Sequence, residues 1–215
     1  MRIFYSSELA PTHPLVIVCT TLGVDLMHQS LITFEAIPNK PSSPYDIVFF
    51  SSPRSYIFGK HLITPDTEIA CFSKGTAASC DFQIAWQGNT PGNPNQTAQD
   101  FKAWAEKKRI LFPVSDRSLG SITNAFPADQ IEVISVYSTR LSPRVITPCD
   151  IYVFTSPSNV TSYLELNQLP SHAKVIAWGL STEDALKSLG INPVYSRTTE
   201  ESIDWSSLLI SWLNP

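Results

Sequence analysis

Segments that are apolar or aromatic throughout alternate along the chain with segments whose apolar residues recur at helical spacing. The runs IVFF at 47–50 and IYVF at 151–154 are typical of strands covered on both faces in a parallel sheet. Strands that alternate with helices form parallel sheets joined by right-handed crossovers. The pattern therefore predicts an α/β protein with doubly wound parallel sheets.

One strand-to-helix passage occurs twice. DIVFFSSPRSY begins at residue 46, and the similar DIYVFTSPSNV begins at residue 150. In each copy a serine, Ser52 or Ser156, is the expected helix N-cap, and the next proline takes the first helical position, where no N–H is needed. A chain of 215 residues is long enough for two domains of about 100 residues each. The repeat therefore predicts two related α/β domains.

A second passage is repeated more loosely. EIACFSKGTAASC at 68–80 and KVIAWGLSTEDALKSLG at 174–190 each read as a strand, a polar turn and a helix. Thr76 and Thr182 stand in the two turns. Ser181 begins a Ser-x-x-Asp sequence, which predicts a capping box at the start of the second helix.

Three further predictions concern the remaining helices. A helix is expected from about Ser118, between strands at 109–112 and 131–139. Thr97 is the expected N-cap of the helix AQDFKAWAEKK, which follows a turn-rich segment. A closing helix is expected to bury one apolar face, formed by Trp205, Leu208, Leu209 and Trp212.

Charge and composition narrow the possible partners. The formal net charge is −4, and the one basic cluster, Lys107-Lys108-Arg109, is short, so nucleic acid is not an expected partner. No apolar run approaches the roughly 20 residues that span a bilayer, and the N-terminal residues lack the pattern of a signal peptide. We therefore expect a cytoplasmic, monomeric protein that binds no membrane.

The usual signatures of metal, nucleotide and hydrolytic sites are missing. The four cysteines include no C-x-x-C pair, and no two of the four histidines stand at ligand spacing, so no metal site is expected. The chain also has no G-x-S-x-G elbow, no phosphate-binding P-loop and no G-x-G-x-x-G turn.

Four hydroxyl-rich turns are the candidate ligand contacts. In open parallel sheets, ligands bind beyond the carboxyl ends of the strands, where helix N-termini offer free N–H groups and partial positive charge. The turns expected there are Ser51 to Arg54, Ser73 to Thr76, Ser156 to Asn159 and Gly179 to Thr182. Helix capping alone explains any one of them. Together they predict a cleft between two domains that suits a ligand with several carboxylates, and the residue patterns lead no further.

Taken in order, these motifs resemble those of the uroporphyrinogen-III synthase family of tetrapyrrole (haem) biosynthesis. FFSSPR and FTSPSN match its Ser-Pro turns, SKGTA and GLSTE match its G-x-x-T-A turns, and the stretch that ends in Val136-Tyr137 matches the segment between its halves. The match extends from about residue 22 to residue 190. The resemblance implies two α/β domains joined by two extended linkers: a discontinuous domain of residues 1–31 and 142–215, and an inserted domain of residues 32–141.

The resemblance also implies a reaction. The enzyme would be a lyase that cyclises the small-molecule substrate hydroxymethylbilane, inverting ring D through a spiro intermediate, and it would need no cofactor. Tyr137 becomes the candidate catalytic acid, because a protonated phenol can donate to the departing hydroxyl oxygen. Glu183 stands where relatives have alanine and is expected to repel a nearby carboxylate. The implied substrate-binding residues are Ser52, Arg54, Thr76, Ser156, Ser158, Ser181 and Thr182.

Two alternatives stay open. A non-catalytic two-domain binding protein for an anionic small molecule would also have paired α/β domains. A degenerate synthase kept as an interaction protein would retain the turns but not the turnover.

Overall fold

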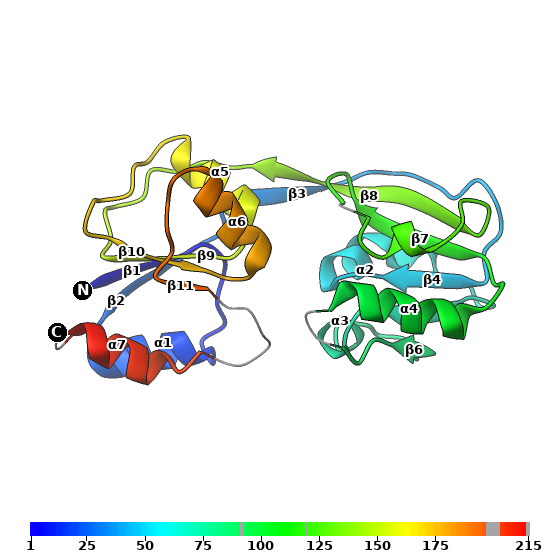
Figure 1. The fold of residues 1–215 in the computed structure, drawn as a ribbon, viewed down its shortest axis with the longest axis horizontal. Helices are drawn as coiled ribbons and strands as arrows, with labels where there is room; N and C mark the ends of the chain where they lie inside the picture. The colour runs from blue at the N-terminus through cyan, green and yellow to red at the C-terminus, as the bar shows by residue number, and fades with distance from the viewer. Residues whose placement is uncertain (91–92, 119, 197–202, 214–215) are drawn as a thin grey trace. The chain divides into compact units, whose positions relative to one another are not determined.

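The fold is that of a computed structural model, which describes residues 1–90, 93–118, 120–196 and 203–213 (Figure 1). The chain divides into two compact units. Unit 1 comprises Met1–Thr33 and Arg140–Pro215, and unit 2 comprises Phe34–Thr139. No helix in the described ranges has the length and apolar character needed to cross a membrane.

Unit 1 contains a five-stranded sheet in the order β11-β10-β9-β1-β2, and its paired strands are all parallel. Its strands are β1 (Arg2–Tyr5), β2 (Asp25–His28), β9 (Ile151–Phe154), β10 (Lys174–Ala177) and β11 (Tyr195–Ser196). Its helices are α1 (Pro14–Leu22), α5 (Pro157–Leu164), α6 (Leu180–Ser188) and α7 (Trp205–Leu213). Helices α1 and α7 cover one face of the sheet, and α5 and α6 cover the other (Figure 1).

Apolar side chains fill both interlayer spaces of unit 1, because its strands bury both faces. Ile3 and Val153 point toward α1 and α7, whereas Phe4 and Tyr152 point toward α5 and α6. The closing helix behaves as its sequence predicts. Its apolar face packs against this core through Trp205, Leu208, Leu209 and Trp212.

Unit 2 contains a six-stranded sheet in the order β3-β8-β7-β4-β5-β6. Its strands are β4 (Ile47–Phe50), β5 (Glu68–Cys71), β6 (Trp86–Gln87), β7 (Ile110–Ser115) and β8 (Ile131–Leu141), with β3 (Ile32–Ala36) at the edge. Its helices are α2 (Pro53–Gly59), α3 (Lys74–Ala77) and α4 (Pro94–Ala105), with the 3₁₀ turns η1 (Lys60–Leu62) and η2 (Thr123–Ala125). Residues of α2, η1 and α3 cover one face of this sheet, and residues of α4 and η2 cover the other.

The chain passes between the units in strands β3 and β8, which pair with each other. The Ile37 amide donates to the Val136 carbonyl at 2.9 Å, and the Ser142 amide donates to the Leu31 carbonyl at 2.8 Å. Residue numbers rise on one strand as they fall on the other, so the two passages run antiparallel.

Each sheet has one point at which the strand order reverses direction. In unit 1 the chain adds β2 on one side of β1 and then β9 on the other side. In unit 2 it adds β5 and β6 on one side of β4 and then β7 and β8 on the other. Such switch points leave a crevice at the carboxyl ends of the two central strands, and this is where open α/β sheets bind ligands. The residues just after β1, β9, β4 and β7 are therefore the ones to examine.

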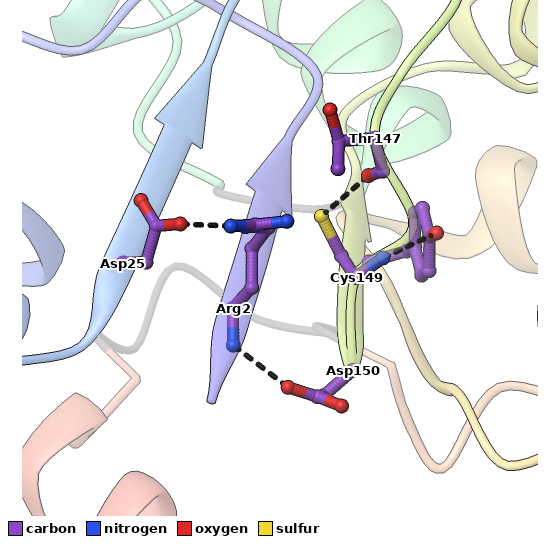
Figure 2. A network of polar contacts seen from close by, with 6 residues as sticks. Arg2, Asp25, Thr147, Cys149 and Asp150 are labelled. Carbon is purple, nitrogen blue, oxygen red and sulfur yellow. Dashed lines mark hydrogen bonds and ion pairs between the residues drawn. The ribbon is translucent and has the colours of Figure 1, made fainter.

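The repeat extends to a side-chain contact at the opposite, amino ends of the strands. Asp150 accepts a hydrogen bond from the Arg2 amide at 2.7 Å, and Asp46 accepts one from the Arg109 amide at 2.8 Å. Arg2 also donates through Nε to Asp25 on the next strand (Figure 2). In each copy the aspartate thus satisfies the first N–H of a neighbouring strand, a group that would otherwise lack a partner.

Three predicted helix starts are wrong. No α-helix begins near Ser118: the structure forms only the turn η2, and Gly120 has φ of +71°, outside the helical region (residue 119 lies outside the described residues). Helix α4 begins at Pro94 and is capped by Asn93, so Thr97 lies inside it, where its hydroxyl donates to the Asn93 carbonyl. Helix α6 begins after Gly179 with no side-chain cap, so Ser181 forms no capping box.

Candidate functional site

The Ser-Pro turn of unit 2 closes on itself. Ser52 caps α2 by accepting from the Ser55 amide at 3.1 Å, and Ser55 Oγ accepts from the Ser52 amide at 3.0 Å. This is a reciprocal capping box, with Pro53 at the first helical position, as the sequence predicts. Ser51, at the end of β4, is exposed, and its hydroxyl makes no hydrogen bond with another described residue.

The Ser-Pro turn of unit 1 is tied to its surroundings. Ser156 caps α5, again as predicted, by accepting from the Asn159 amide at 3.3 Å. Asn159 is buried, and its side-chain carbonyl accepts from the Leu31 amide at 2.9 Å. Thr155 and the fully buried Ser6 bind each other through their hydroxyls and backbones, which joins the ends of β9 and β1 at the switch point.

The second pair of turns buries the two predicted threonines. Thr76 lies within the short helix α3, and its hydroxyl is 3.3 Å from the hydroxyl of the N-cap Ser73. Thr182 lies in the first turn of α6, and both threonines are almost completely buried. Ser181 beside Thr182 is exposed. The surface of these turns is therefore formed by serine side chains and free helix-start N–H groups rather than by the threonine hydroxyls.

Glu183, the acidic residue at the start of α6, has a cationic partner. Its carboxylate is 2.6 Å from the Lys187 ammonium one turn along the helix. The hydrogen bond to Lys187, with a second one to Ser196, holds the pKa of Glu183 below its ordinary value. The negative charge at this turn is therefore neutralised locally.

A hollow of about 210 Å³ lies at the carboxyl ends of β4, β5 and β7 in unit 2. Its lining combines aromatic and aliphatic residues with serines and a threonine. The lining includes Phe72, Phe112, Val114, Ser51, Ser121 and Thr123. The hollow thus coincides with the switch point between β4 and β7, where the topology places a ligand site.

Tyr137 lies on β8 among aromatic side chains. Its ring stacks on Phe58 with centroids 5.1 Å apart and meets the edge of Phe34 at 6.0 Å. The Arg54 guanidinium lies over the Phe34 ring, 3.5 Å from its centroid. Within the described residues, no hydrogen bond is made by the Tyr137 hydroxyl and no acidic side chain pairs with Arg54. Both polar groups are therefore available to a ligand.

Comparison with known proteins identifies the family. A sequence model described as uroporphyrinogen-III synthase HemD matches residues 13–203, which include both Ser-Pro turns and Tyr137. The chain belongs to this family. Uroporphyrinogen-III synthases are lyases of haem biosynthesis that act on a small molecule, so the predicted enzyme class is confirmed. No curated protein sequence gives a significant match.

Solved structures from the uroporphyrinogen-III synthase family share the fold. The crystal structure of uroporphyrinogen-III synthetase from Helicobacter pylori 26695 matches with a TM-score of 0.70 at 17% identity, and the match covers 100% of both chains. A mutant synthase from the thermophilic bacterium Thermus thermophilus matches with a TM-score of 0.56 at 15% identity, over 99% of this chain and 97% of that one. These likenesses confirm the predicted two-domain α/β fold class.

The predicted site residues of this family member fall into two groups. Unit 2 brings together the α2 start, with Ser52 and Arg54, and Tyr137, because Phe34 contacts both Arg54 and Tyr137. Thr76 follows on the next turn. Unit 1 holds Ser156, Ser158, Ser181 and Thr182 on the starts of the adjacent helices α5 and α6.

Phe34 and Phe58 were not predicted, and Ser51 and Asn159 were predicted only as the ends of two turns, with no role of their own. The repeat carried a signal for Ser51 and Asn159. When the two copies are aligned, Ser51 stands opposite Thr155 and Ser55 stands opposite Asn159. The two turns differ in their hydrogen bonds at these two positions. The aromatic neighbours of Tyr137 come from separate segments, and no local pattern connects them.

Proposed function

We propose that the protein is a uroporphyrinogen-III synthase that converts hydroxymethylbilane to uroporphyrinogen III. The observation that carries the proposal is the family match over residues 13–203, which contains all four hydroxyl-rich turns and Tyr137. In this reaction the linear tetrapyrrole loses its hydroxyl group and becomes an electrophilic azafulvene. Ring D attacks through its substituted carbon, and the resulting spiro intermediate opens and closes again with ring D inverted.

The substrate carries several carboxylates, and the turns supply neutral donors for them. Helix N-termini bind anions through free N–H groups and partial positive charge, without a basic protein surface. We assign this role to the turns at Ser52, Ser156 with Ser158, Ser181, and Thr76 and Thr182. The amides of the two buried threonines are already bonded, that of Thr76 to the Ser73 hydroxyl and that of Thr182 to the Gly179 carbonyl. In the described chain the available donors at these turns are the N–H groups just before them, such as those of Gly75 and Ser181. Arg54 adds one charged contact, supported by its lack of an acidic partner in the described part of the chain.

The hollow in unit 2 is large enough for only part of this substrate. The aromatic and aliphatic residues of its lining suit one pyrrole ring, and its serine and threonine residues suit the carboxylates that the ring carries. Holding the rings in a folded arrangement is the main requirement of the reaction, because the spiro route has to outrun direct closure of the chain.

Tyr137 assists the loss of the hydroxyl group. A phenol has an ordinary pKa of about 10, so it is protonated at neutral pH and can donate to the departing oxygen. Two observations support this role: the ring is held by aromatic neighbours, and the hydroxyl has no hydrogen-bond partner among the described residues. After the proton has moved, the nearby Arg54 guanidinium stabilises the phenolate.

The remaining assignments rest on the sequence and on the unit bounds. The two units serve as the two domains of the enzyme, the first built from both ends of the chain. The reaction needs no cofactor. We also propose a monomer in the cytoplasm with no nucleic-acid partner, and the net charge of −4 supports the last point.

Product analysis tests the proposal. The purified protein is incubated with hydroxymethylbilane, the products are oxidised, and the type I and type III uroporphyrins are separated chromatographically. Unassisted closure gives type I, so dominant type III establishes the synthase. Type I alone, from folded protein, would instead favour a non-catalytic binding protein.

The Tyr137→Phe variant tests the assignment of the acid. We expect its rate of type III formation to fall by about 100-fold, the lower end of the range for general acid catalysis. The single hydroxyl is lost while the ring contacts remain, so KM should change little. An unchanged rate would remove Tyr137 from the mechanism.

A further inference from the structure

Strand β8 has one residue more than its partner β7 immediately before Tyr137. Val114 pairs with Ser135, and the next residue, Ser115, pairs with Tyr137. Val136 is therefore left without a partner on β7, which makes it a β-bulge, while its carbonyl accepts from the Ile37 amide on the other side. Bulges are rare in parallel pairs, and they commonly lie beside active sites, where they re-aim a side chain.

The bulge decides which face of the sheet Tyr137 occupies. Side chains alternate along a strand, so Ile134 and Val136 share a face, and a regular strand would send Tyr137 to the opposite one. In the structure all three side chains belong to the same apolar cluster, on the face covered by α2. The extra residue thus moves Tyr137 onto the face that carries Arg54.

Backbone contacts fix the residues around the bulge. The Tyr137 carbonyl accepts from the Asp116 amide at 3.0 Å. The Asp116 carboxylate accepts from the Thr139 amide at 3.2 Å. The strand segment from Tyr137 to Thr139 is therefore anchored to Asp116, the residue just after β7, at the switch point of unit 2.

Two aromatic rings then determine the orientation of the Tyr137 side chain. Phe58, near the end of α2, stacks on it at an interplanar angle of 23°, and Phe34 of β3 meets it edge to face at 72°. With 8% of its surface exposed, Tyr137 has little freedom to turn. Aromatic pairs of this kind contribute about 0.5–1.5 kcal/mol beyond the burial of their area. Phe58 supplies the flat contact, which restricts rotation of the ring most directly.

We propose that Phe58 is a positioning residue for the reaction and acts on catalysis only through Tyr137. The proposal rests on the proposed function, in which the Tyr137 hydroxyl contacts the departing oxygen. A misplacement of about 1 Å can cost about 100-fold in rate, so a loosened ring is expected to lower kcat without weakening the binding of substrate.

The experiment is a double-mutant cycle in the full-length protein. Phe58→Leu keeps an apolar side chain but removes the stacked ring, and we expect kcat for type III formation to fall about tenfold with KM within twofold of wild type. Phe58→Tyr keeps the stacked ring, so its kcat should stay close to that of wild type. In the Tyr137→Phe background, Phe58→Leu should cause no further loss, because the group that it positions is already missing.

A matched control separates positioning from general destabilisation. Phe126 is more deeply buried than Phe58, and it packs on the opposite face of the same sheet. Phe126→Leu should lower stability to urea at least as much as Phe58→Leu while leaving kcat close to wild type.

The outcomes distinguish the positioning role of Phe58, the assignment of Tyr137 as the acid and the proposed function. Equal losses from Phe58→Leu in both backgrounds, or an unchanged rate in the single variant, would overturn the positioning role alone. A Tyr137→Phe variant with the wild-type rate would overturn the assignment of the acid and the positioning role together. A wild-type protein that forms only type I product would overturn the proposed function itself.

Discussion

The two copies of the Ser-Pro turn have the same backbone and different attachments. Each begins with a serine N-cap and a proline, and each is completed by the third helical residue, which is Ser55 in unit 2 and Asn159 in unit 1. Among the described residues, the Ser55 side chain forms hydrogen bonds only with Ser52 of its own turn. Asn159 donates to Ser156 and Thr155 and also accepts from the Leu31 amide.

The difference follows from the chemistry of the two side chains. A serine hydroxyl is short and reaches only the neighbouring backbone, whereas an asparagine amide has a donor end and an acceptor end on a longer side chain. In unit 1 the acceptor end reaches the chain at Leu31, just before β3. Because the Leu31 carbonyl also accepts from the Ser142 amide, the turn is connected through a single residue, Leu31, to both passages of the chain.

The same strand-to-helix backbone therefore carries two kinds of Ser-Pro turn. The turn of unit 1 is fastened to the end of β1 and to Leu31, so its donors are fixed before any ligand arrives. The turn of unit 2 leaves Ser51 unbonded at the edge of the hollow. We therefore expect substitutions in the first turn mainly to affect stability, and substitutions in the second mainly to affect binding.

The largest expected effect comes from making the two turns alike. Asn159→Ser retains a serine-type capping box but leaves the Leu31 amide buried without its acceptor. An unsatisfied buried donor costs about 1–3 kcal/mol. Urea unfolding measures the loss, and hydrogen exchange should become faster at the Leu31 amide specifically.

The control for this variant is Thr161→Ala, which removes an exposed hydroxyl on the same helix and should be nearly neutral. If Asn159→Ser were as stable as this control, the link to Leu31 would carry no energy.

Smaller effects of two different kinds are expected at the residues just before the two N-caps, Thr155 in unit 1 and Ser51 in unit 2. Thr155→Val removes a hydroxyl that bonds Ser6, and it should cost about 1 kcal/mol of stability. Ser51→Ala removes an unbonded hydroxyl, so stability should stay within about 0.5 kcal/mol of wild type. The KM for hydroxymethylbilane should instead rise about tenfold, the loss expected for one hydrogen bond to a charged group.

Steady-state kinetics and urea unfolding on both variants decide the matter. A rise in KM for Thr155→Val with no change for Ser51→Ala would reverse the roles assigned to the two turns.

The sequence predicts the parts of this molecule that follow from local rules. Ser52 and Ser156 are N-caps because a hydroxyl followed by proline after a buried strand fits no other element as well. The prediction from sequence fails at Thr97, because Asn93, one turn earlier, caps the helix instead. It also fails at Ser181, because the helix has already begun after Gly179. Cap residues compete, and backbone geometry decides between them.

The site was less predictable than the fold, for a physical reason. Tyr137 was found through the family's motif, but the bulge at Val136 depends on the register between β8 and β7, which no local pattern states. Tyr137 contacts Phe34 and Phe58 only after β3, α2 and β8 have packed, and the contact of Arg54 with Phe34 requires the same packing. The contact from Asn159 to Leu31 spans 128 positions in the chain and likewise requires the finished fold.

The smallest expected effect concerns the second pair of turns, where unit 1 has Glu183 and the aligned position of unit 2 is Ala77. The pKa of Glu183 is lowered in the folded protein, chiefly by Lys187. A lowered carboxyl pKa stabilises the fold above the unfolded value of about 4.3, and that contribution is lost as the pH falls through the folded pKa. We therefore expect Lys187→Met to melt below wild type at pH 6–7, by a difference that shrinks as the pH falls through the folded pKa of Glu183.

Thermal melts of wild type and Lys187→Met at several pH values between 3 and 7 measure that difference, and the comparison cancels the other groups that titrate in this range. The two residues are one turn apart on one helix and Lys187 is exposed to solvent, so the difference should be small. A difference that stayed constant with pH would mean that Lys187 stabilises α6 through its methylene groups rather than its charge. The same variant frees the Glu183 carboxylate, so its KM for the anionic substrate should rise slightly at neutral pH, whereas unit 2, with alanine at this position, has no such charge to release.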